Sequence, residues 1–267
     1  MSKVFLNSLP KSGTHLAGKL LELMGVKFSN VNFSSSTIYG RYALPKSILR
    51  GTSLGQPGID VGLDISAVAR ISWMEKSLQQ VKSGTYCGGH APYSDALCTL
   101  LKDNDFKTIH IVRDPRDVLL SWVHYVPKNN WHYGCEGLKN LSFDEQVRKV
   151  LYGYQSRGFR LESFSSILSR ASGWLRRQDV LLTRFEELVG VKGGGNDQQQ
   201  VQNIQSIVKF IGVQNIDTNF LADNLFGGTK VFRKGQIGAW KDELPTYLID
   251  EINGNIEKHI IQTGYDL

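Results

Sequence analysis

The chain of 267 residues is 41% hydrophobic and 21% charged, a balance that excludes a disordered or fibrous protein. Lysine and arginine number 31 against 25 acidic residues, and the net charge of +6 suits an anionic ligand without separating nucleic acid from nucleotide. Cys87, Cys98 and Cys135 have no CxxC spacing, so they predict neither a disulfide framework nor a structural zinc site. The polar N-terminus and the lack of a run of about 18 apolar residues predict a cytoplasmic protein with no membrane contact.

The first elements are predicted to be a strand, a tight loop and a helix. The apolar run 4–6 predicts a buried strand, and the loop 10–14 follows it. Apolar residues then recur at every fourth position from Leu16 to Met24, which predicts a helix. Repeated glycine and proline residues predict an irregular excursion over 27–64, either a substrate wall or lid or a plain surface insertion.

Strands and helices alternate through the rest of the sequence. Strands are predicted at 85–87, 108–112 and 179–183. Helices are predicted at 65–81, from Ser94 or Asp95 to Leu101, from Pro115 to Val126, and at 143–156, 160–176, 201–211 and 245–261.

This alternation predicts an α/β fold with a central parallel sheet flanked by helices on both faces. We see no internal repeat and no linker, and we expect residues 1–267 to form one domain. In such sheets ligands bind at the carboxyl ends of the strands, which is where the candidate residues fall.

The loop after the first strand carries phosphate-binding chemistry. A strand that turns tightly into a helix presents backbone N–H groups and the positive end of the helix dipole to an anion. Lys11 adds a charge, Ser12 and Thr14 add hydroxyl groups, and Gly13 permits close approach of the backbone. The alternative is an ordinary capped helix. A Walker loop is excluded, because its lysine follows the second glycine of GxxxxGK[ST], whereas Lys11 precedes Gly13.

Three segments together resemble the cytosolic-type sulfotransferases, a family with a P-loop-NTPase-like three-layer architecture. Residues 10–15, Pro-Lys-Ser-Gly-Thr-His, resemble its PKSGTTW loop for the 5′-phosphosulfate. Residues 111–125 are similar to its 3′-phosphate segment, in which an arginine at a strand end is followed by a serine on the next helix. Residues 232–241 resemble its RKGxxGDWK segment. The three segments occur in the family's order, and the resemblance covers nearly the whole chain.

The resemblance implies that the donor is 3′-phosphoadenosine 5′-phosphosulfate (PAPS), with 3′-phosphoadenosine 5′-phosphate (PAP) as product and no metal requirement. The planar fork of Arg113 suits a phosphate, and Ser121 lies eight residues later, about two helical turns on. Arg184, in a segment similar to the family's RYEDL, is expected near adenine. The residues implied to bind the donor are Lys11, Ser12, Gly13, Thr14, His15, Leu16, Arg113, Ser121, Arg184, Phe232, Arg233, Lys234 and Gly235.

His90 is the candidate catalytic base, and Lys11 the candidate catalytic cation. Histidine has a pKa near working pH, and His90 follows a predicted strand at the place of the family's Lys-Thr-His-Leu-Pro element. The alternative is a structural histidine in a turn. The sequence departs from the family at three places: Gly88 replaces the lysine before the histidine, Leu16 replaces a tryptophan that often stacks on adenine, and Ala239 replaces an acidic residue.

The predicted function is transfer of a sulfuryl group from PAPS to a hydroxyl or amine of a small-molecule acceptor, which a natural product would fit, by in-line displacement with a histidine base. A P-loop-like kinase of a nucleotide or small metabolite and a non-catalytic polyanion binder are the alternatives. We expect no nucleic-acid partner, and both a monomer and a homodimer remain open. No pattern in 27–64 identifies the acceptor.

Overall fold

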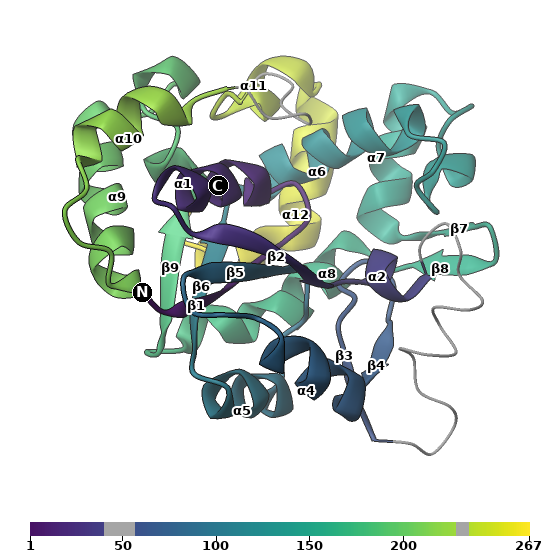
Figure 1. Cartoon of the computed structure of the whole chain (residues 1–267). Coiled ribbons are helices and arrows are strands. Elements are labelled where there is room, and N and C mark those ends of the chain that lie inside the picture. The colour runs from purple at the N-terminus through teal and green to yellow at the C-terminus, as the bar shows by residue number, and fades with distance from the viewer. Residues whose placement is uncertain (40–56, 228–234) are drawn as a thin grey trace.

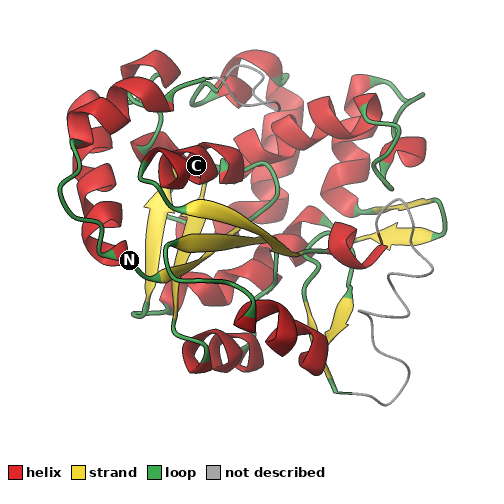
Figure 2. Cartoon of the chain, viewed as in Figure 1, coloured by secondary structure: helices red, strands yellow, loops and turns green. Residues whose placement is uncertain are grey.

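A five-stranded parallel sheet forms the centre of the computed structural model, which describes residues 1–39, 57–227 and 235–267 (Figures 1 and 2). The strand order is β2-β5-β1-β6-β9. In this sheet β1 (Lys3–Ser8) lies between β5 (Thr85–Gly89) and β6 (Phe106–Val112), with Phe5 opposite Cys87 on one side and Thr108 on the other. The outer strands are β2 (Lys27–Phe33) and β9 (Val180–Arg184). Two antiparallel hairpins lie outside the sheet, β3 (Gly58–Asp60) with β4 (Val68–Arg70), and β7 (Tyr154–Ser156) with β8 (Phe159–Leu161).

Helices cover both faces of the sheet, and alternate residues of the central strand are therefore buried under opposite helical layers. Val4 and Leu6 pack with α1 (Thr14–Leu23), α9 (Asp197–Ile211) and α10 (Thr218–Leu225), whereas Phe5 packs with α4 (Ile71–Gln79), α5 (Asp95–Asp103) and Trp174. The predicted α/β fold with a parallel sheet between helical layers is therefore confirmed. The helices are α1 (Thr14–Leu23), α2 (Ser35–Tyr39), α4 (Ile71–Gln79), α5 (Asp95–Asp103), α6 (Pro115–Tyr125), α7 (Phe143–Tyr152), α8 (Phe164–Ala171), α9 (Asp197–Ile211), α10 (Thr218–Leu225), α11 (Ala239–Glu243) and α12 (Thr246–Gln262).

Within the excursion predicted over 27–64, residues 27–33, 35–39 and 58–60 are regular elements, so the prediction of irregular chain is wrong for these ranges. Residues 27–33 form an edge strand of the main sheet, in which only Phe33 is buried. Because so little of this strand is buried, its sequence alternates with polar residues and contains no apolar run. The helix predicted at 65–81 begins only at Ile71, after β4. The two helices predicted over 143–176 are separated by the β7–β8 hairpin. Residues 40–56 of the excursion lie outside the described residues.

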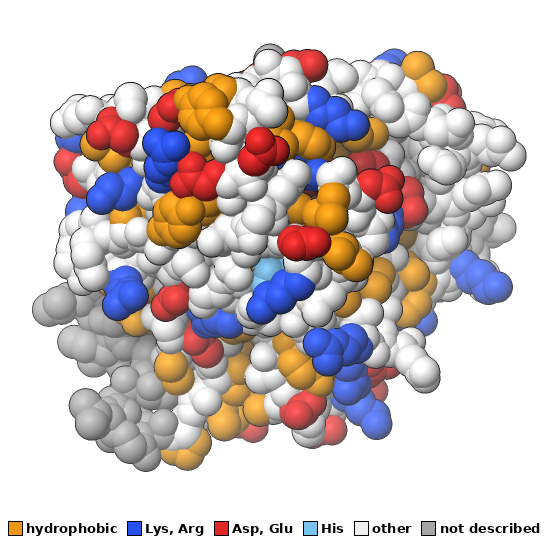
Figure 3. Space-filling view, turned by 180° about the vertical axis from the view of Figure 1, so that it is seen from behind, with side chains coloured by type: hydrophobic (Ala, Val, Ile, Leu, Met, Phe, Trp, Pro, Cys, Tyr) orange, Lys and Arg blue, Asp and Glu red, His pale blue; other side chains and the backbone are white. Residues whose placement is uncertain are grey.

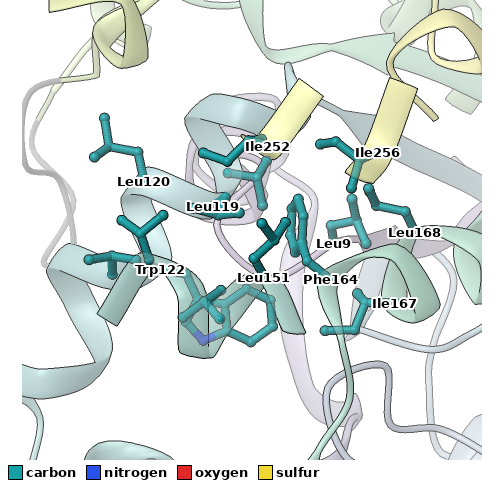
Figure 4. Close-up of a cluster of buried hydrophobic side chains, with 14 of the residues drawn as sticks. Leu9, Leu119, Leu120, Trp122, Leu151, Phe164, Ile167, Leu168, Ile252 and Ile256 are labelled. Atoms are coloured by element: carbon teal, nitrogen blue, oxygen red, sulfur yellow. The ribbon is translucent and has the colours of Figure 1, made fainter. Parts of the chain in front are cut away.

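A hydrophobic cluster of α6, α7, α8 and α12 anchors the start of the loop after β1 (Figure 4). Leu9, 4% exposed, leaves β1 and packs in this cluster with Leu168 and Ile256. Phe164 meets Trp122 of α6 nearly edge-on, with ring centroids 6.4 Å apart. The start of the loop after β1 and helix α6 therefore pack in the same hydrophobic cluster.

The face opposite that of Figure 1 carries basic and acidic side chains mixed together rather than separated by sign (Figure 3). Within the described residues, no helix is both long and apolar enough to cross a bilayer.

Candidate active site

A cavity of about 1480 Å³ opens at the carboxyl ends of β1, β5 and β6. Such an edge is where open parallel sheets bind ligands. The loop after β1, the end of β5, the start of α6 and the segment before α11 all contribute to its walls. Nine of the predicted site residues line it: Lys11, Gly13, Thr14, His15, Leu16, His90, Arg113, Ser121 and Gly235.

The loop after β1 adopts a backbone that presents the start of α1 to the cavity. Lys11 and Gly13 both have left-handed φ values, 74° and 104°. A Cβ at position 13 would also lie 2.7 Å from the Phe185 ring, so only glycine fits. Gly13 is the N-cap residue and supplies no side-chain cap, which leaves the first backbone N–H groups of α1 for a ligand.

Two side chains around this loop have polar atoms without a hydrogen-bond partner in the described residues. The Ser12 hydroxyl is fully buried under the loop rather than lining the cavity, and its Oγ has no partner. The buried Nε of Arg113 has none either. Because buried polar groups normally find partners, the Arg113 atom at the cavity wall fits an anionic ligand.

Arg113 connects three segments that are far apart in the sequence. Its Nη2 donates to the carbonyl of Gln236 at 2.9 Å, and its Nη1 donates to that of Lys11 at 3.5 Å. The guanidinium lies over the Phe185 ring at 4.1 Å and pairs with Asp117 at 3.4 Å. The strand end at β6 thus holds the first loop and the C-terminal segment against one cavity wall.

Carboxylates of α6 dock the segment that leads into α11. Asp117 accepts hydrogen bonds from the N–H groups of Gly238 at 2.9 Å and Trp240 at 3.2 Å. Burial raises the pKa of Asp117, and Arg113 together with these N–H groups opposes that shift. Asp114 accepts from the Trp240 indole at 3.2 Å. Gly235 is therefore held at the cavity by the hydrogen bonds of Gln236, Gly238 and Trp240, which follow it in the sequence.

His90 lies at the end of β5, with its ring at the cavity. Its Nδ1 is 3.0 Å from the carbonyl oxygen of Ser8, and a carbonyl can only accept, so Nδ1 carries the proton. The unprotonated nitrogen is then Nε2, which can accept a proton from a ligand. Burial lowers the pKa of His90 below 6.5, although the backbone of Ser8 and the charge of Asp64 oppose the shift. The ring is therefore neutral at neutral pH, as a base requires.

A sulfotransferase-domain family model matches residues 1–264. The chain belongs to this family. It is also 24% identical over 187 residues to cytosolic sulfotransferase 12 of Arabidopsis thaliana, an alignment that covers 61% of this chain and 53% of the plant protein. The chain thus spans about half the length of this curated relative.

Solved structures share the fold of this sulfotransferase family member. The crystal structure of mouse sulfotransferase SULT7A1 complexed with PAP aligns over 97% of this chain and 84% of its own, with 17% identity and a TM-score of 0.61. Retinol dehydratase in complex with androsterone and PAP aligns over 99% of this chain and 82% of its own, with 15% identity and a TM-score of 0.58.

The site of this sulfotransferase-family chain differs from the sequence prediction at Arg184. The guanidinium lies over the Tyr265 ring at 4.8 Å, next to Gly264, and Arg184 does not line the cavity. Tyr265 in turn donates to Glu186, which accepts from the backbone of Asp114. The predicted contacts at Phe232, Arg233 and Lys234 lie outside the described residues.

The other end of the cavity is lined by polar and aromatic side chains. Asp64, 4% exposed, accepts from the hydroxyl groups of Ser35 at 2.6 Å and of Tyr133. The Tyr133 ring is tilted by 54° against that of Phe159, with ring centroids 6.0 Å apart, and Trp131 lines the cavity with half its surface exposed. These residues give this end of the cavity both hydrogen-bonding groups and aromatic faces.

Sequence reasoning also missed Asn7 and Asp117. Asn7 follows the apolar run 4–6 directly and is buried in the same strand. A polar amide at that place breaks the apolar pattern, and this was a signal in the sequence. Asp117 lies four residues after Arg113 in the run Arg-Asp-Pro-Arg-Asp, a spacing that places the two side chains on one side of a helix. Within the described residues, no group of three or more histidine, cysteine or acidic side chains has a geometry that could hold a metal ion.

Proposed function

We propose that the protein is a PAPS-dependent sulfotransferase that acts on a hydroxyl or amine of a small-molecule acceptor. The observation that carries the proposal is the convergence of the Lys11 loop, Arg113 and His90 on one cavity, with Arg113 bonded to both flanking segments. The family match supports this reaction, and none of the comparisons supports the kinase alternative.

The donor end of the cavity suits two anionic groups. The N–H groups at the start of α1, with Lys11 beside them, suit the 5′-phosphosulfate. Arg113 and Ser121 share the wall at α6 and suit the 3′-phosphate. Two structural neighbours were solved in complex with PAP, which supports this choice of ligand. Ser12 does not line the cavity, and its backbone N–H donates to the Leu9 carbonyl at 3.2 Å, so we assign it no direct contact with the donor.

The transfer step is assigned to His90 and Lys11. The acceptor hydroxyl loses its proton to His90 Nε2 while its oxygen forms a bond to the donor sulfur, and the bond between sulfur and the 5′-phosphate oxygen breaks to release PAP. The Ser8 carbonyl holds the proton of His90 on Nδ1 and orients the ring for this role. Lys11 Nζ lies 3.6 Å from the centre of the Tyr125 ring at the same cavity, within reach of the charge that develops on the leaving phosphate.

The acceptor is proposed to be a small molecule that enters between Trp131, Tyr133 and Phe159. Androsterone and retinol are the small molecules bound in two of the structural neighbours. We further propose that residues 1–267 act as one domain and that the protein works in the cytoplasm, by its likeness to a cytosolic plant relative.

The test is a transfer assay with ³⁵S-labelled PAPS and a panel of phenols, alcohols and amines, run beside an ATP hydrolysis assay. Labelled product with PAPS and no hydrolysis of ATP is expected. Calorimetry with PAP, with and without EDTA, accompanies it, and equal affinity in both is expected. Tighter binding of ATP than of PAP, dependent on magnesium, would instead identify a kinase, and PAP binding with no transfer to any acceptor would identify a binding protein.

A further inference from the structure

The chain segment that follows His90 is held by a side chain from the neighbouring strand. The N–H of Ala91 donates to Asn7 Oδ1 at 3.0 Å, and Asn7 Nδ2 donates to the carbonyl of Ala91 at 3.1 Å. Asn7 lies opposite Gly89 in the parallel pairing of β1 with β5. A side-chain amide has the donor and acceptor of a peptide group, so Asn7 continues the hydrogen bonding of the sheet beyond the last residue of β5.

Position 89 must be glycine for this reach to be possible. A Cβ there would lie 3.1 Å from Asn7 Oδ1 and 2.7 Å from the Phe5 ring. The Asn7 side chain therefore crosses over residue 89 to reach Ala91. The second glycine of the Gly-Gly-His run thus has a defined structural reason.

Two further side chains complete the arrangement. The indole Nε1 of Trp174 donates to the same Ala91 carbonyl at 3.0 Å, and Trp174 is fully buried. The second hydrogen of Asn7 Nδ2 points to His110 Nδ1 at 3.3 Å, which must accept it. Burial lowers the pKa of His110 to about 3, so the ring stays neutral and able to accept. Asn7, Ala91 and Trp174, with His110 behind them, are called the Ala91 clamp below.

We propose that the Ala91 clamp, through Asn7 and Trp174, is a positioning device that sets the place and tautomer of His90. The His90 peptide is already fixed by its own N–H to the Phe33 carbonyl at 2.9 Å and by Leu63 N–H to its carbonyl at 3.1 Å. With Ala91 held at both backbone groups, the chain on either side of the His90 ring is fixed, and Nδ1 lies 3.0 Å from the Ser8 carbonyl oxygen. This inference rests on the proposed function only for the effect on transfer.

A general base acts only within hydrogen-bond reach of its proton, and a displacement of about 1 Å can cost about 100-fold in rate. Asn7 has no exposed surface, so it cannot touch a ligand itself, and its two hydrogen bonds to Ala91 connect it to the chain beside His90. Loss of the clamp should therefore lower kcat while the donor, which binds at α1 and α6, keeps its affinity.

The test compares Asn7→Leu with the matched variant Gln200→Met. Gln200 of α9 is also a buried amide that bonds a backbone carbonyl, that of Leu188 at 2.6 Å, but it lies away from His90. Asn7→Leu should lower kcat by about 10- to 100-fold with PAP affinity within about threefold of wild type, whereas Gln200→Met should change neither once corrected for the folded fraction. An equal kcat in the two variants, or a parallel loss of PAP affinity in Asn7→Leu, overturns the proposal.

A spectroscopic readout separates this inference from the proposed function. In protein labelled with ¹⁵N-histidine and assigned with His90→Asn, wild-type His90 should show the tautomer protonated at Nδ1, and Asn7→Leu should show a mixture. An unchanged His90 signal in Asn7→Leu overturns the proposal, even if the wild type transfers no sulfuryl group. If Asn7→Leu does not fold, Trp174→Phe removes the indole donor together with part of the buried ring, and it must shift the same signal or the proposal fails.

Discussion

Arg113 should discriminate ligands by their 3′-phosphate. Arg113→Ala removes the buried Nε that has no partner in the described residues, together with the two Nη atoms. A charge-assisted pairing of a fork with a phosphate contributes roughly 2–4 kcal/mol. That free energy corresponds to a Kd for PAP that rises about 30- to 700-fold. Adenosine 5′-phosphate lacks the 3′-phosphate and should be affected much less.

The comparison of the two ligands is necessary because Arg113 also has a structural role. Its loss leaves Asp117, whose side chain is fully buried, without its ion pair, and it frees the Gln236 carbonyl. Those changes loosen the segment before α11 and weaken both ligands. Arg113→Lys keeps the charge near Asp117 but loses the planar fork, so it should reproduce most of the PAP-specific loss. Calorimetric titrations of both nucleotides that show equal factors of weakening would refute the assignment of the 3′-phosphate to Arg113.

Two predictions concern His90. His90→Ala should lower turnover by about 100-fold or more while PAP affinity stays near that of the wild type, and His90→Asn tests the same point with a side chain of closer shape. Steady-state assays with a hydroxyl acceptor measure the turnover. Near-normal turnover would contradict the assignment of His90 as the base. Burial lowers the pKa of His90, and a base acts in its neutral form. The acid limb of kcat/KM against pH should therefore lie below 6.5, the ordinary value for histidine, and a limb above 6.5 would show that another group titrates.

The strands could be predicted from the sequence where both faces are buried, and not where one face meets solvent. β1 and β6 read as apolar runs because helices cover both sides of the sheet there. β2 is an edge strand whose first two residues are exposed, and its polar residues gave no such run. The β7–β8 hairpin was missed for a different reason, since two strands of three residues are too short to show a periodic pattern.

The candidate site was predictable where its chemistry depends on backbone and local spacing. Gly13 and Arg113 sit next to strand ends, so the sequence placed them at one edge of the sheet before any contact was known. The partners of those residues were not predictable, because Asp117 and Gln236 meet at Arg113 only through the packing of α6 against the C-terminal segment. Arg184 is the last residue of β9, yet its guanidinium lies over the ring of Tyr265 near the C-terminus. No local sequence pattern predicts that contact.

Gly88 leaves the cavity without the lysine that the resemblance places two residues before the histidine. A Cβ at position 88 would lie 3.0 Å from Asn32 Oδ1, so a longer residue there would require the end of the Asn32 side chain of β2 to move. The cation for the leaving phosphate is then assigned to Lys11, which lines the cavity beside Tyr125.

Lys11→Met should therefore reduce kcat by at least about 100-fold, the usual cost of losing one preorganised charge partner in a transfer step. Gly88→Lys alone should restore little, because the end of the Asn32 side chain must move to admit it, whereas Gly88→Lys with Asn32→Ala should recover part of the loss in the Lys11→Met background. Steady-state assays of the four proteins at saturating PAPS measure this. Wild-type kcat in Lys11→Met would show that the charge on the leaving group is met elsewhere, and rescue by Gly88→Lys without the Asn32 change would show that Asn32 does not limit that space.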